Sequence, residues 1–492
     1  MAEVWRTSRI GGETRKRGVF GAISLLLIGG FTIAGVLWLV LMVITSSLVI
    51  LIGGALLLLV AWQLARRQTT AGDSWLRLWF DRTWFQFVNG RGHGGTWKPE
   101  MGLPAEVGPM RELVWSADRS PVAFLHQRHP KAAYGADSHL TAVLEIVGGG
   151  DGLHMIGAAN RRGAQFGQLL KSLASPTSHV DQADFETRVL PSDPVAYQEA
   201  VSAMIVCDCP PTLRASMDQL AATAANKTET YRSFMTVRMR LGDIQASAGG
   251  GLDAEQTTEA AAEVLRGVVS RTEAAGFPVR TILGPRRYAA MIRHLYVPAF
   301  ELDDVSGLEV VPDGWQWPYT SHQQGVEVHG PTGSWWHAVA SVPRDAWPIK
   351  AIGTRWLETL VADVNPRTIR TVKASHHLVH RSDARRQARI AATYDRAQLH
   401  TQRSKGQVST GESEASESAA NTVLSDVLGG AAGDRPSLRI AVSAPSLPEL
   451  LKAREALNES ADNADLVRLG WHDYRHHQAM LLMAPLGRGM KP

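Results

Sequence analysis

The chain has 492 residues, of which 20% are charged and 45% are apolar. This composition is typical of a folded protein and excludes a disordered chain. The formal net charge is only +4, so no domain-wide basic excess indicates nucleic-acid binding. The two cysteines, Cys207 and Cys209, cannot build a disulfide framework and lack the C-x-x-C spacing of zinc and redox sites.

The first predicted element is a membrane anchor. Residues 18–65 contain no Asp, Glu, Lys or Arg, and their length suits two apolar spans better than one helix. The polar cluster at 45–47 places the turn between helices at 20–42 and 47–65. Basic residues flank the run on both sides, so the positive-inside rule predicts a plasma-membrane protein with two spans and both termini in the cytoplasm.

An aromatic-rich stretch follows at 74–87 and is expected to be helical. Two interpretations remain open. The helix lies in the plane of the lipid headgroups, with Arg77 and Arg82 toward the phosphates, or it is the first core helix of the soluble region. Residues 88–107 are rich in Gly and Pro and indicate a linker.

Strand-like and helix-like stretches then alternate in two series. The first series predicts strands at 141–147, 180–190, 233–241 and 279–283, and helices at 160–174, 211–228, 253–275 and 285–296. The second predicts strands at 336–342, 368–375, 437–443 and 466–469, and helices at 354–364, 378–402, 447–461 and 474–483. The matching order is suggestive of duplicated halves in which helices stack on a sheet.

The expected fold class is therefore a membrane α-hairpin joined to a cytosolic α/β (α+β) region with two duplicated sheet-and-helix halves. The expected organisation is a basic cytoplasmic N-terminus at 1–17, the hairpin at 18–67, an interfacial helix and linker at 68–107, a first half at 108–300, a linker at 301–333, and a second half at 334–492 with a flexible loop at 403–420.

Two patterns could carry chemistry. The turn Gly148–Gly152 follows a strand and precedes a helix, so it either cradles a phosphate on backbone N–H groups or is only a sharp turn. The pairs His376/His380 and His472/His476 have helical spacing but lack an H-E-x-x-H motif, and we interpret them as solvated histidines. We therefore assign no catalytic, cofactor-binding or metal-binding residue.

The predicted helix 378–402 is rich in arginine. Such a stripe is usually a solvated face, but it can also dock an acidic partner, lipid or DNA. The candidate contact residues of the chain are Arg77, Arg82, Arg381, Arg385, Arg386 and Arg389.

Three stretches carry a resemblance to a known family: the basic segment 15–21 (RKRGVFG) before the apolar run, 166–173 (FGQLLKSL), and the chain end 484–490 (APLGRGM). The chain resembles an actinobacterial integral membrane family of conjugative, type IV secretion-like gene clusters. In that family the hairpin is similar to a PrgI-type subunit and is fused to a larger cytosolic module.

The resemblance implies a non-enzymatic structural membrane component without a cofactor. Its implied partners are a hexameric secretion ATPase, which it scaffolds, a polytopic channel subunit and membrane lipid. An EccE-type subunit of type VII secretion is a related alternative. Two further alternatives are a membrane-bound enzyme that binds a phosphate at Gly148–Gly152, and direct nucleic-acid contact through the basic helix.

Overall fold

The computed structural model describes residues 7–8, scattered positions between 32 and 83, and residues 96–488 with gaps. The gaps are 105–106, 108, 117–119, 128–137, 149–155, 192–198, 200, 205–208, 226–228, 344–345, 349–351, 354, 363, 365–367, 405–410 and 431–432.

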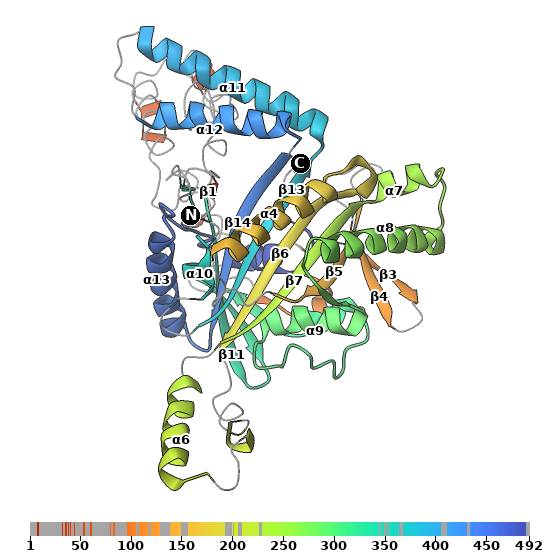
Figure 1. The fold of residues 1–492 in the computed structure, drawn as a ribbon, viewed down its shortest axis with the longest axis vertical. Helices are drawn as coiled ribbons and strands as arrows, with labels where there is room; N and C mark the ends of the chain where they lie inside the picture. Colours follow the sequence, from red (N-terminus) through yellow and green to blue (C-terminus); the bar gives the residue numbers. More distant parts are fainter. Residues whose placement is uncertain are drawn as a thin grey trace.

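In the described part of the chain, one sheet of thirteen strands forms the centre of the molecule (Figure 1). Its neighbours all pair antiparallel. The four central strands are long, and they lie in the order β14 (Gly433–Ala444), β13 (Ile369–Val379), β6 (Val180–Pro191) and β7 (Glu229–Arg240). Because β6 pairs with β13, the two predicted series meet in the middle of the sheet.

The connectivity is the same on both sides of the β6–β13 pair. Beyond β7 lies β5, whose outer edge is shared by β4 and β8; beyond β14 lies β11, whose outer edge is shared by β10 and β15. The bounds are β3 (Met110–Ser116), β4 (Pro121–Gln127), β5 (His139–Ile146), β8 (Val279–Ile282), β2 (Thr96–Trp97), β9 (Tyr319–Ser321), β10 (Val326–Gly330), β11 (Gly333–Ser341) and β15 (Gly470–Trp471). A separate pair joins β1 (Thr7–Ser8) to β12 (Ile352–Gly353).

Helices cover both faces of the sheet. In the described part of the chain, the α-helices whose bounds are defined are α4 (Ile156–Leu173), α6 (Pro211–Ala225), α7 (Leu241–Ser247), α8 (Ala254–Ala274), α9 (Pro285–Tyr296), α10 (Glu358–Val361), α11 (Arg381–Ser404), α12 (Gly411–Leu428), α13 (Leu447–Asn463) and α14 (His476–Met483). Short 3-10 helices lie at Pro99–Met101, Pro176–Ser178 and Val311–Gly314.

Period-two alternation along the strands separates the two faces. Met235 and Val237 of β7 pack into an apolar cluster with α4 and α8, and on the same face the β11–β14 pair packs under α13. Phe234 of β7 and Val143 of β5 point the other way, into a cluster with α9 and α14. The sheet is therefore a middle layer between two layers of helices.

Helical segments project from opposite ends of the sheet (Figure 1). The chain between β6 and β7 forms α6, and the chain between β13 and β14 forms α11 and α12. Because β6 and β13 run antiparallel, their connections leave from opposite ends.

The structure corrects the expected fold class. The two series do not form separate halves, since β6 and β13 pair along eight residues and merge them into one sheet. Two separate halves would each leave a long strand edge with unpaired N–H and C=O groups, which the pairing satisfies. The predicted flexible loop 403–420 is also wrong at 403–404, where α11 ends, and from residue 411 onward, where α12 begins.

The expected membrane hairpin is corrected as well. Among the described residues, no helix is both long enough and apolar enough to cross a membrane. Most of 18–67 lies outside the described residues. A charge-free apolar run meets the length condition for two spans, but the run alone does not specify continuous helices. The two-span plasma-membrane location and the membrane assignments that depended on it are therefore overturned.

Candidate functional site

Four of the predicted contact arginines lie together on α11, which packs along α12. The packing side of α11 consists of Ala384, Ala388, Ala392 and Leu399, all buried. Small alanine side chains at four-residue spacing let the second helix approach closely. The two helices therefore form a helical hairpin at one end of the sheet.

One flank of this hairpin is basic. Arg385, Arg389 and Arg396 occur at i, i+4 and i+11, so they share one side of α11. On this side Arg396 Nε lies 3.8 Å from Glu417 Oε1 of α12. Arg386 is also exposed, and it contacts Asp383 at 3.2 Å. We call Arg385, Arg389 and Arg396 the basic flank.

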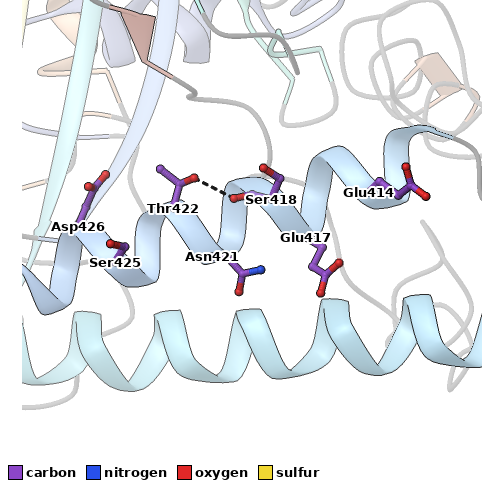
Figure 2. A pocket seen from close by; sticks show the side chains of 7 residues that line it. All are labelled: Glu414, Glu417, Ser418, Asn421, Thr422, Ser425 and Asp426. Carbon is purple, nitrogen blue, oxygen red and sulfur yellow. Dashed lines mark hydrogen bonds between the residues drawn. The ribbon is translucent and has the colours of Figure 1, made fainter.

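The neighbouring helix α12 has the opposite character. It contains four acidic residues and no Lys or Arg. Figure 2 shows Glu417 and Asn421 pointing toward α11, whereas Thr422 and Asp426 point away from it. The Thr422 hydroxyl donates to the Ser418 carbonyl at 2.9 Å, so its donor has a hydrogen-bond partner within α12. The hairpin thus presents a basic helix and an acidic helix side by side.

The remaining predicted contact residues are not part of this cluster. Arg77 lies outside the described residues. Arg82 is exposed. Burial raises the pKa of Tyr474, and the charge of Arg82 opposes that shift, which places Arg82 near Tyr474.

At the opposite end of the sheet, α6 carries an apolar stripe that the sequence analysis did not identify. Leu213, Met217 and Leu220 occur at i, i+4 and i+7 and are 57%, 43% and 63% exposed. The helix itself was predicted at 211–228, and this spacing was the signal available. Without a structure, such a stripe is indistinguishable from one that packs on a core.

Of the paired histidines, His376 and His476 are buried, whereas His380 and His472 are partly buried. Each has a hydrogen-bond partner, so the prediction of solvated helical histidines is wrong. His376 lies in β13, where its Nδ1 is 2.7 Å from Asp434 Oδ2. Burial acts to lower the pKa of His376, but the Asp434 carboxylate outweighs burial and raises it. His476 Nδ1 accepts from the Val339 backbone N–H at 3.0 Å, and burial lowers the pKa of His476.

Charged side chains also fill the centre of the sheet, on the face toward α9 and α14. Lys373 Nζ of β13 lies 3.2 Å from Asp184 Oδ2 of β6, and neither side chain is exposed. Arg188 donates to Thr371 Oγ1 at 2.6 Å and to the His294 carbonyl at 3.1 Å. Sequence reasoning missed this set, although alternating Asp184-x-Glu186-x-Arg188 within a predicted strand was a visible signal.

The end of the described chain packs against these buried charged side chains, which we call the polar layer. Lys373 Nζ donates to the Ala484 carbonyl at 2.9 Å, and the Tyr288 hydroxyl donates to the Pro485 carbonyl. Gln127 Nε2 donates to the next carbonyl, of Leu486, at 3.0 Å, and Arg238 donates to that of Gly487 at 3.1 Å. Four successive carbonyls are thus held by side chains of β13, α9, β4 and β7. We call residues 484–487 the tail segment.

Glu186 is a buried carboxyl group in this layer. Burial raises its pKa to about 7, although Lys373 and Arg188 act to lower it. Below the ordinary carboxyl pKa, the Glu186 side chain is protonated in both the folded and the unfolded chain. Its burial then does not lower the free energy of unfolding through ionisation. As the pH rises from 4.5 to 7, the unfolded chain ionises first, so the folded state loses stability.

We therefore expect Glu186→Gln to raise the free energy of unfolding by about 3 kcal/mol at pH 8 and to leave it nearly unchanged at pH 4.5. Urea unfolding followed by tryptophan fluorescence at both pH values measures this difference. The control is Glu459→Gln on the exposed side of α13. An equal gain at both pH values would show that the pKa of Glu186 is not raised in the folded state.

These buried groups hold the protein together and are closed to a substrate, because the tail segment and two helices cover them. Among the described residues, no group of three or more His, Cys, Asp or Glu side chains could hold a metal ion. The candidate docking surfaces for a partner protein are the basic flank and the stripe on α6. Neither a family model nor a curated protein matches this sequence.

Proposed function

We propose that the protein is a non-catalytic assembly subunit that holds a partner protein on the basic flank of α11. The observation that carries the proposal is that the three arginines of the basic flank share one side of a projecting helix, where Arg396 lies 3.8 Å from the acidic group of Glu417. Arginine is suited to such contacts because its planar fork binds carboxylates in bidentate geometry.

The family resemblance suggests the hexameric ATPase of a type IV secretion-like machine as this partner. An EccE-type role in type VII secretion would use the same surface for the ATPase of that system, so the two assignments differ in which ATPase binds. The position of the hairpin at one end of the sheet supports a scaffold, because a docked partner leaves the other end accessible (Figure 1).

The test is a binding titration between the purified full chain and the hexameric ATPase of a type IV secretion-like system. We expect the double variant Arg385→Glu/Arg389→Glu to weaken binding at least about tenfold, because complementary charges become like charges. Arg266→Glu on α8 and Met217→Glu on α6 are the controls, and both should bind as the unchanged chain does. Both control sites are exposed and distant in the fold from the hairpin.

Two results would contradict the proposal. One is unchanged ATPase binding by the double variant. The other is binding to a random DNA duplex that is as tight as binding to the ATPase and falls steeply with salt, since that dependence is typical of phosphate contacts.

A further inference from the structure

A cavity of about 450 Å³ lies beside α4, on the face of the sheet opposite the tail segment. Its walls come from the end of β5, from α4, from the turn after α8 and from the chain before α10. Its volume is within the range of small-molecule sites. Gly148 lines it, whereas the rest of the predicted turn Gly148–Gly152 lies outside the described residues.

The polar groups of this cavity are cationic. Arg162 of α4 and Arg355, which precedes α10, both line it, and none of its ten lining residues is acidic. Arg355 also bonds Glu358 within its own turn, which holds the guanidinium in place and leaves other N–H groups on its fork. Two guanidinium groups at one cavity favour an anion, above all a phosphate.

The rest of the lining is apolar or has no side chain. Phe166 and Phe277 meet edge to face, with ring centroids 6.2 Å apart, and Pro278 and Val147 extend this apolar wall. Val147 is 48% exposed although it is apolar. Gly163 and Gly276 also line the cavity, and neither contributes a side chain. An apolar wall beside two cations suits a ligand with a flat body and an anionic end.

We propose that this cavity binds an organic phosphate with a flat body, of the size of a nucleoside monophosphate. The two arginines hold the phosphate and the Phe166–Phe277 wall contacts the body. The inference goes beyond the proposed function, because the cavity shares no residue with the basic flank.

The test is calorimetric titration of the full chain with adenosine monophosphate, with adenosine and with inorganic phosphate. We expect saturable binding of adenosine monophosphate and at least tenfold weaker binding of the two fragments. Arg162→Ala and Arg355→Ala should each weaken binding at least tenfold. Gly163→Leu should abolish it without a change of charge, because leucine fills the cavity while favouring the helix.

Arg161→Ala is the matched control, since Arg161 is an exposed neighbour on α4 that does not line the cavity. The double variant Arg385→Glu/Arg389→Glu should also bind the nucleotide normally, which separates this proposal from the docking function. The proposal is overturned by three results: absence of saturable binding, equal losses in Arg161→Ala and Arg162→Ala, or inorganic phosphate binding as tightly as the nucleotide. Circular dichroism confirms that each variant is folded.

Discussion

Replacing Lys373 by methionine is expected to lower the free energy of unfolding by about 3–5 kcal/mol, because it leaves a buried charge without its partner. Asp184 loses the ammonium group 3.2 Å away, and the Ala484 carbonyl loses its donor. Neither side chain of the pair is exposed, so water cannot replace what is removed. Urea unfolding at pH 7 measures the loss.

The matched control is Lys452→Met, which makes the same change on the exposed side of α13 and should alter stability by under about 0.5 kcal/mol. A second variant separates charge from packing. Asp184→Leu/Lys373→Met removes both charges, and it should recover much of the loss because an apolar pair needs no compensation. A loss under about 1 kcal/mol for Lys373→Met alone would contradict the buried ion pair.

The second large effect is expected at Gly487. Its φ is +60°, and an added Cβ would lie 2.8 Å from Thr141 Cγ2 and 3.2 Å from Arg238 Cβ. Gly487→Ala therefore combines backbone strain with a steric clash, and displacement of the tail segment also breaks the Arg238 and Gln127 bonds to its carbonyls. We expect a loss of about 3–5 kcal/mol.

Gly307→Ala is the matched control for backbone strain alone. Gly307 has a similar φ of +70°, but no atom lies within 4 Å of an added Cβ. We expect a loss of about 1–2 kcal/mol there. Hydrogen exchange should show faster exchange around the tail segment in Gly487→Ala than in Gly307→Ala. Equal stability and exchange in the two variants would mean that the tail segment is not held as described.

Both predictions give a structural role to the tail segment, which lies in one of the stretches that carry the family resemblance. The carbonyls of Pro485, Leu486 and Gly487 accept from buried side chains, and Arg488 donates to Gln127 Oε1 at 2.7 Å. A short motif can thus reflect a packing requirement rather than a chemical one.

Local patterns alone located several elements correctly. The period-two runs at 180–190 and 233–241 are β6 and β7, and the helical spacing at 253–275 is α8, which Asp253 caps by accepting from the Gln256 backbone N–H. The arginines of α11 were also found together, because residues four apart on a helix share a side whatever the rest of the fold does. The predicted docking role of that side stays a prediction.

Only the tertiary structure decided which strands meet and which side chains are closed off from water. The β6–β13 pair joins residues that are far apart in sequence. No local sequence pattern in either strand identifies the strand with which it pairs. That pairing buries Asp184 and Lys373 together, whereas the same charges on an edge strand would be solvated. Likewise, the apolar character of Leu213 and Leu220 was readable from the sequence, but their exposure was not. Composition and periodicity fix the local conformation, while burial depends on what packs against it.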